Sequence, residues 1–215
     1  MQQILVYGDS LSWGIVPGTR ERLPFGQRWP GALEGLLAAQ GTAARVIEDC
    51  LNGRRTVWDD PFKPGRNGLQ GLAQRIEICS PLALVVLMLG TNDFQSSHAN
   101  TAWHSAQGLG ALLQAIRQAP IEPGMPQPPV LVVAPPPLGT PCGAAAEKFA
   151  GGDVRCLGLA AAQQAVARQH GCAFFDAGTV VQASRTDGVH LDADQHARLA
   201  QALAPVVAGL LAARG

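Results

Sequence analysis

The chain has 215 residues, 47% of them hydrophobic, which is enough to bury one sizeable core, so we expect a single domain over residues 1–215. Sixteen basic side chains balance sixteen acidic ones, and this neutrality argues against nucleic acid or an anionic membrane as a partner. A small molecule is the expected partner.

Short apolar segments alternate with stretches of helical spacing along the chain. The apolar segments predict buried strands at residues 3–7, 45–50, 82–89, 130–134 and 173–176. Helices are predicted at residues 29–40, 68–79, 101–119, 154–170 and 192–213, the last with Pro205 as a point of bending. This alternation predicts an α/β protein, a three-layer α/β/α sandwich around a five-stranded parallel sheet with flavodoxin-like strand order. Ligands are then expected at the carboxyl ends of the strands.

Four segments break the alternation, at residues 14–28, 54–67, 121–129 and 135–152. Long loops in a compact domain are usually functional or disordered. We expect these segments to build the rim of a pocket.

The first predicted strand ends in Gly8-Asp9-Ser10-Leu11. This places the Ser10 hydroxyl at the strand-to-loop turn, a position that suits a nucleophile. Taken alone, Gly-Asp-Ser is also ordinary turn chemistry, in which the polar side chains bond nearby backbone groups.

Polar turns also follow the second and third strands. Asn52-Gly53 follows the second strand, and Gly90-Thr91-Asn92-Asp93 follows the third. A serine that attacks an ester creates an oxyanion, which needs preorganised donors. The backbone N–H groups of Ser10 and Gly53 and the side-chain amide of Asn92 are candidates, although glycine at position 53 is equally consistent with a left-handed turn.

The fifth strand is followed by Asp187-Gly188-Val189-His190, just before the last helix. His190 is a candidate general base for Ser10, and Asp187 is placed to orient the imidazole. An isolated Asp-x-x-His is more often a helix-start turn with a solvated histidine. The catalytic interpretation is favoured because all four polar segments lie at strand ends of one sheet.

Four ordered blocks of the chain resemble those of the SGNH (GDSL-type) hydrolase family: Gly8-Asp9-Ser10-Leu11, Gly53, Gly90-Thr91-Asn92-Asp93 and Asp187-Gly188-Val189-His190. The match covers nearly the whole chain. The resemblance implies Ser10 as nucleophile, His190 as base with Asp187 as its orienting partner, and Ser10, Gly53 and Asn92 as oxyanion donors.

Within that family the chain is similar to the bacterial arylesterase and acyltransferase group. The segments that carry this similarity are Ser10-Leu11-Ser12-Trp13-Gly14, Arg28-Trp29, residues 55–61, Asn67-Gly68 and residues 133–138. The similarity implies a serine esterase for short-chain acyl or aryl esters, with acyl transfer to alcohols or peroxide as a further route. The reaction requires no metal and no organic cofactor.

We also expect an apolar, narrow substrate pocket, which suits a short acyl chain or an aryl leaving group. Its candidate wall residues are Leu11, Trp13, Phe94, Phe149 and Val189. Each of these side chains could equally belong to the core.

Two other readings remain open at this point. On the same fold, the protein could be a carbohydrate acetylesterase or a lysophospholipase and thioesterase. In a different class, it could be a non-catalytic flavodoxin-like binding module, although no phosphate-cradling glycine loop supports that reading. A metal enzyme is disfavoured because the histidines at 98, 104, 170 and 196 lack close ligand spacing.

The remaining expectations concern location and assembly. The first ten residues lack a signal-peptide pattern, and no apolar segment approaches about 18 residues, so we expect a cytoplasmic protein without a membrane span. The five cysteines are expected to be free thiols. The loop at residues 58–66 looks exposed and rich in aromatic residues and prolines, which suggests an interface between copies of a homo-oligomer.

Overall fold

One five-stranded sheet forms the centre of the computed structural model, which describes residues 1–213. The strands are β1 (Gln2–Gly8), β2 (Ala44–Cys50), β3 (Leu84–Met88), β4 (Val130–Ala134) and β5 (Ala173–Asp176). All neighbours pair in parallel, in the order β2-β1-β3-β4-β5. The predicted flavodoxin-like order is confirmed, and β4 and β5 have the predicted bounds.

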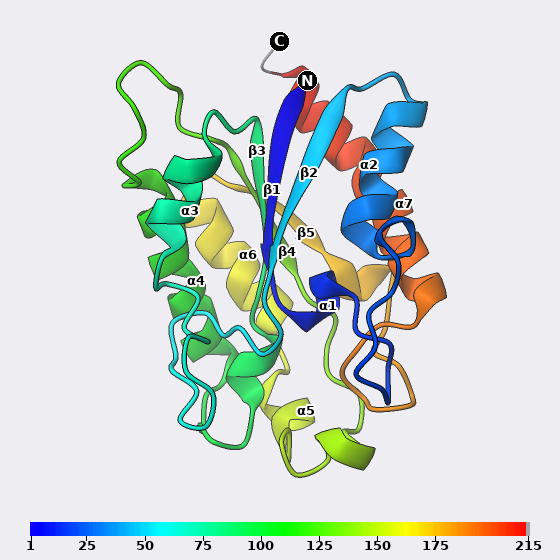
Figure 1. Cartoon of the computed structure of the whole chain (residues 1–215). Helices are drawn as coiled ribbons and strands as arrows, with labels where there is room; N and C mark the ends of the chain where they lie inside the picture. The colour runs from blue at the N-terminus through cyan, green and yellow to red at the C-terminus, as the bar shows by residue number, and fades with distance from the viewer. Residues whose placement is uncertain (214–215) are drawn as a thin grey trace.

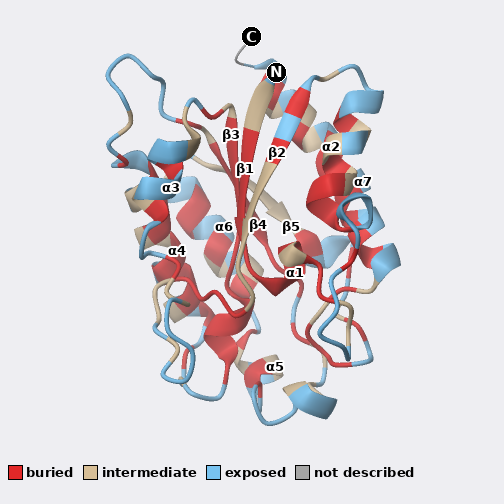
Figure 2. Cartoon of the chain, in the orientation of Figure 1, coloured by how far each residue is buried: buried red, intermediate tan, exposed pale blue. Residues whose placement is uncertain are grey.

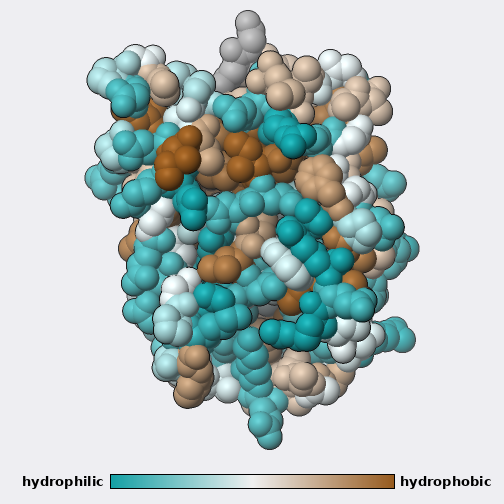
Figure 3. Space-filling view, in the orientation of Figure 1, coloured by the Kyte–Doolittle hydropathy of each residue, from teal (hydrophilic) through white to brown (hydrophobic). Residues whose placement is uncertain are grey.

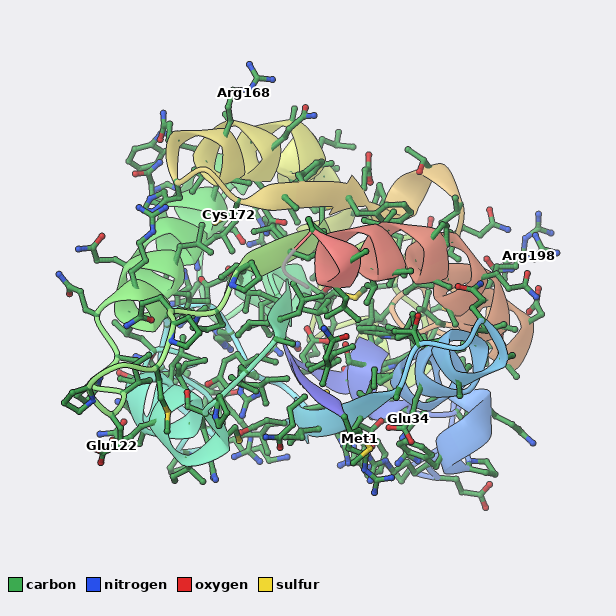
Figure 4. The ribbon with its side chains drawn as sticks, turned by 90° about the horizontal axis from the view of Figure 1, so that it is seen from above. Met1, Glu34, Glu122, Arg168, Cys172 and Arg198 are labelled. Atoms are coloured by element: carbon green, nitrogen blue, oxygen red, sulfur yellow. The ribbon has the colours of Figure 1, made fainter. Side chains whose placement is uncertain are left out.

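Helices cover both faces of the sheet (Figure 1). On one face lie α2 (Trp29–Ala39) and α7 (Ala193–Ala212), and on the other lie α3 (Leu72–Cys79), α4 (Ala102–Arg117) and α6 (Leu159–Gln169). The view from above, turned by 90° from that of Figure 1, shows the same two helical layers with the sheet between them (Figure 4). The predicted three-layer α/β/α sandwich is confirmed.

A separate apolar core fills each side of the sheet, because the inner strands β1, β3 and β4 are largely buried on both faces (Figure 2). One core joins alternate residues of β1, β3 and β4 to α2 and α7, and includes Trp29 and Leu199. The other joins the opposite residues of these strands to α3, α4 and α6, and includes Tyr7 and Leu112. Strand β5, at the edge of the sheet, is only half-buried.

Two predicted helices differ from the structure because glycines interrupt them. The predicted helix at 154–170 is two helices, α5 (Gly152–Arg155) and α6, separated at Gly158, whose φ is +84°. The predicted helix at 68–79 begins only at Leu72, because the preceding Gly71 has a φ of +77°. A residue in the left-handed region cannot continue a right-handed helix, and glycine adopts that region without a steric penalty. Helix α7, in contrast, continues through Pro205.

The carboxyl ends of the strands meet at the lower end of the molecule in Figure 1, opposite the N-terminus. The short helix α1 (Ser10–Trp13) follows β1 there. Short 3-10 turns complete the chain at Phe25–Gln27, Thr91–Phe94, Gly143–Ala145 and Ala177–Thr179. No helix within residues 1–213 is both long enough and apolar enough to span a bilayer.

Candidate active site

The turn after β1 holds Ser10 at the first position of α1. Asp9 caps this helix, because its carboxylate accepts a hydrogen bond from the N–H of Leu11 at 2.9 Å. The side chain of Ser10 is fixed by this short, capped helix rather than by a mobile loop. Only 4% of Ser10 is exposed, so its hydroxyl lies at the bottom of the site.

His190 reaches Ser10 from the other end of the chain. Its Nε2 lies 3.1 Å from the Oγ of Ser10, and its Nδ1 lies 2.7 Å from Oδ2 of Asp187. The structure thus brings together the three residues that the sequence singled out as nucleophile, base and orienting acid. In this arrangement Nδ1 carries the proton that bonds the carboxylate, which leaves Nε2 as an acceptor for the hydroxyl proton.

The loop that carries His190 is folded around the carboxylate of Asp187. Oδ1 of Asp187 accepts hydrogen bonds from the backbone N–H groups of Val189 and His190, both at 2.9 Å. Burial alone would raise the pKa of Asp187, but the hydrogen bonds from the imidazole and the backbone outweigh it and hold the pKa well below its usual range. Asp187 is therefore a stable carboxylate at neutral pH.

Only glycine fits at position 188, between Asp187 and Val189 in this loop. Its φ is +74°, and a Cβ there would lie 2.2 Å from the carbonyl oxygen of Thr140. Any side chain would therefore push the loop off its neighbour and move His190 away from Ser10.

The three residues predicted to supply the oxyanion donors, Ser10, Gly53 and Asn92, all line the same cavity. Gly53 has a φ of +83°, so both interpretations of this glycine hold: it is a left-handed turn residue and it lies at the site. Within residues 1–213, the backbone N–H groups of Ser10 and Gly53 donate to no other protein group.

Asn92 is held in a single orientation by two neighbours. Its Nδ2 donates to Oδ2 of Asp9 at 2.9 Å, and its Oδ1 accepts from Nε2 of Gln95 at 2.7 Å. An amide with both ends engaged keeps its second N–H aimed in a fixed direction. Burial raises the pKa of Asp9 to about 6, against the lowering effect of the hydrogen bond from Leu11.

Two supporting residues were not assigned from the sequence. Gln95 positions Asn92, and its Oε1 accepts a hydrogen bond from the buried guanidinium of Arg55 at 2.7 Å. Asp93 accepts hydrogen bonds from the backbone and the hydroxyl of Thr56 and from the hydroxyl of Ser105. It thereby ties the loop that contains Gly53 to the end of β3. In the sequence, the position of Asp93 next to Asn92 could have indicated its supporting role, whereas no pattern distinguished Gln95.

The cavity over Ser10 has a volume of about 400 Å³. Of the five residues predicted to form its wall, only Phe149 lines it. Leu11 instead packs in the core beside α2 and α7, while Phe94 and Val189 belong to a small apolar cluster that also contains Phe149. Trp13 is not among the residues that line the cavity, and the guanidinium carbon of Arg22 lies over its indole ring, 4.6 Å from the ring centre. These four predictions were wrong: Leu11, Phe94 and Val189 pack into apolar clusters, and Trp13 is covered by Arg22.

The cavity is also more polar than predicted. Its lining includes Arg20, Asn52, Asp60, Lys63 and Lys148. Hydrophilic side chains cover much of the lower half of the face shown in Figure 3. The lining is therefore mixed, with Ile15 and Phe149 beside the charged side chains, and the narrow shape of the pocket stays a prediction.

The other histidines do not form a metal site. Among residues 1–213, no group of three or more His, Cys, Asp or Glu side chains is placed to hold a metal ion. His196 is buried, and its Nδ1 accepts a hydrogen bond from the backbone N–H of Trp29 at 3.2 Å. The rings of His98 and His104 lie 6.1 Å and 6.5 Å from that of Trp58, which is half-buried rather than exposed.

Comparison with known proteins identifies relatives over almost the full length of the chain. Residues 6–198 match the GDSL-like lipase/acylhydrolase family. A solved carbohydrate acetylesterase family member from Sinorhizobium meliloti is 36% identical, with a TM-score of 0.92 over 99% of this chain and 100% of that one. The native aryl esterase of M. smegmatis is also 36% identical, with a TM-score of 0.91 over 98% of this chain and 100% of that one. No curated protein sequence matches the chain.

Proposed function

The chain belongs to the GDSL-like lipase/acylhydrolase family, and from this premise we propose that it hydrolyses short acyl and aryl esters of small molecules with Ser10 as nucleophile. It is a serine esterase, a carboxylic ester hydrolase. The hydrogen-bonded series Ser10, His190 and Asp187 carries the assignment of the reacting groups.

In the first step, Oγ of Ser10 attacks the ester carbonyl carbon while Nε2 of His190 takes the hydroxyl proton. The carbonyl π bond becomes an oxyanion. The resulting imidazolium is stabilised by the carboxylate of Asp187, 2.7 Å from Nδ1. The oxyanion then collapses, the C–O bond to the alcohol breaks, and His190 returns its proton to the leaving alkoxide. The acyl group remains on Ser10.

The oxyanion is proposed to accept hydrogen bonds from the N–H groups of Ser10 and Gly53 and from the amide of Asn92. Donors that are already oriented cost no reorganisation as the charge develops, and each contributes on the order of 3 kcal/mol to lowering the barrier. The fixed orientation of Asn92 between Asp9 and Gln95 supports this role.

In the second step a nucleophile attacks the acyl-serine, and His190 takes its proton. The bond between the acyl carbon and Oγ of Ser10 then breaks, and His190 returns the proton to Oγ. Water gives hydrolysis, and an alcohol or peroxide gives acyl transfer. We propose that transfer competes with hydrolysis when alcohol is added. Product analysis in dilute alcohol tests this, because equal amounts of free acid with and without alcohol would contradict it.

The volume of the cavity favours a small substrate. At about 400 Å³ it lies toward the lower end of the usual range for ligand sites, roughly 300–1,000 Å³. An acetyl or butyryl ester fits such a volume better than a long fatty acyl chain, which disfavours the lysophospholipase and thioesterase alternative.

A carbohydrate acetylesterase is the second candidate. The polar lining, with Asn52, Asp60 and the basic side chains, offers hydrogen-bond partners for hydroxyl groups. The relative from S. meliloti is named as a carbohydrate acetylesterase family member. Release of acetate from acetylated sugars, compared with release from phenyl acetate, distinguishes the two candidates.

Hydrolysis of p-nitrophenyl acetate, butyrate and octanoate tests the main proposal. We expect activity to fall with chain length and to disappear in Ser10→Ala. Ser12→Ala is the matched control, because Ser12 lies on the same short helix but is buried against Met88. Activity that survives in Ser10→Ala, or equal rates on acetate and octanoate, would contradict the proposal.

Two further expectations stay predictions: a cytoplasmic location and a homo-oligomer. For the oligomer, Phe62 is the exposed apolar residue of the 58–66 loop, with 86% of its surface accessible. Light scattering of the wild type and of Phe62→Ser measures whether this loop joins two copies.

A further inference from the structure

The chain contains only two lysines, Lys63 and Lys148, and both line the cavity over Ser10. Arg20 lines the same cavity. The three cations come from three separate loops, at residues 14–28, 54–67 and 135–152.

The two acidic side chains of the cavity, Asp60 and Asp187, form direct ion pairs with other groups than these cations. Asp60 pairs with Arg55 at 3.5 Å and accepts hydrogen bonds from the backbone N–H groups of Phe62 and Lys63. Asp187 pairs with His190. Within residues 1–213, no carboxylate lies within ion-pair distance of Arg20, Lys63 or Lys148.

The cations also act on one another. Partial desolvation in the cavity wall lowers the pKa of both lysines, and neighbouring cations, Arg20 among them, lower it further, although the carboxylate of Asp60 opposes this by raising the pKa of both. An anion bound among them would relieve this repulsion. A concave site lined by one sign of charge also raises the local concentration of oppositely charged ligands.

We propose that Arg20, Lys63 and Lys148 form a recognition site for a negatively charged group on the ester substrate, a carboxylate in the simplest case. The inference rests on the proposed esterase function and narrows its substrate class to anionic esters. The anionic group lies on either the acyl or the alcohol portion of the ester, and the two are separated by experiment.

Two matched pairs of substrates place the charge on each side. For the acyl side, mono-p-nitrophenyl adipate is compared with its methyl ester. For the alcohol side, 4-acetoxybenzoate is compared with methyl 4-acetoxybenzoate. The measured quantity is the ratio of kcat/KM for the anionic ester to kcat/KM for its neutral partner. This ratio is compared between the wild type and each variant, because the different intrinsic reactivities of the two esters then cancel.

The variants are Lys63→Gln, Lys148→Gln and the double substitution, with Lys63→Arg and Lys148→Arg as charge-preserving versions. We expect each glutamine variant to lower the ratio about 3- to 5-fold, as for one partly exposed ion pair, and the double variant to lower it roughly 10-fold. The arginine variants should retain the wild-type ratio. Added salt should reduce the wild-type ratio, because it screens exposed charges.

Arg168→Gln controls for the loss of one positive charge elsewhere. Arg168 lies in the last turn of α6, which leads into the amino end of β5 and so ends far from the cavity, and it projects away from the molecule in Figure 4. A ratio that falls for one substrate pair only assigns the charge to that side of the ester. An unchanged ratio in the double variant for both pairs, or an equal fall in Arg168→Gln, would overturn the inference. Hydrolysis of the neutral esters that depends on Ser10 would still leave the esterase function standing.

Discussion

The Nε2 atom of His190 lies 3.1 Å from the Oγ atom of Ser10, although 180 positions separate the two residues in the chain. The sheet makes this contact, because the carboxyl ends of β1 and β5 lie at the same end of the parallel sheet, and after β5 the chain turns back through Asp187 to reach Ser10. The site therefore forms only when the whole sheet is assembled.

Replacement of His190 by alanine should lower kcat by a factor on the order of 10⁶, because Ser10 then loses its base. The kcat of the double variant Ser10→Ala/His190→Ala should be no lower than that of the less active single variant, since the two residues act as one unit. Steady-state rates of the three variants measure this. Additive losses would show that the two residues act independently.

Asp187→Asn should also lower kcat, by about 10³–10⁴. An asparagine keeps the size of the side chain but offers its amide toward Nδ1 of His190, which favours the wrong tautomer of the imidazole. The circular dichroism spectrum should remain that of the wild type, so that the loss is chemical. A variant with near wild-type kcat would remove Asp187 from the mechanism.

Asn92→Ala should lower kcat by about 10²–10³ with little change in KM, because an oxyanion donor acts mainly in the transition state. Gln95→Ala should cause a smaller loss, since Gln95 only orients Asn92 through a 2.7 Å hydrogen bond. Separate determination of kcat and KM checks both. A rise in KM alone would make Asn92 a ground-state binding residue.

Stability should depend on pH through His196. Burial, with smaller contributions from the positive charges of His190 and Arg28, lowers its pKa to about 4. In the unfolded chain this histidine binds its proton near pH 6.5. The stability that depends on a neutral His196 is therefore fully present above that pH, and the free energy of unfolding decreases as the pH falls toward 4. The loss amounts to roughly 3 kcal/mol.

Asp9 and Asp93 act in the opposite direction over the same range. Burial raises the pKa of each to about 6, so their contributions to the free energy of unfolding are complete below about pH 4 and are lost as the pH rises through 6.

Urea unfolding at pH 7, 5.5 and 4 should therefore be compared between wild type and His196→Asn, which keeps an acceptor for the N–H of Trp29. The stability of the wild type relative to the variant should decrease with falling pH. Parallel curves would contradict this account.

The sequence predicted the sheet, its order and the contact among Ser10, Asp187 and His190 because each depends on local signals. Apolar runs mark the strands, and polar turns mark their carboxyl ends, which parallel topology brings together. The split before α6 was missed because the sequence does not reveal that Gly158 has positive φ. Most glycines in helical patterns are tolerated.

The lining of the cavity was predicted poorly because it depends on side-chain direction. Leu11 follows the nucleophile, yet it turns into the core, and Val189 turns away from the cavity beside His190. Loops far apart in the sequence supply most of the wall. The chain's two lysines in two predicted rim loops were a usable signal, since a rare charged residue in a loop is seldom needed for packing.

Covalent labelling with a fluorophosphonate, followed by intact mass measurement and peptide mapping, tests the central claim most directly, because the reagent reacts with activated serines. The account predicts a single adduct on Ser10, retained in Ser12→Ala, strongly slowed in His190→Ala and absent in Ser10→Ala. An adduct on another residue, or labelling of Ser10→Ala at the wild-type rate, would contradict Ser10 as the nucleophile.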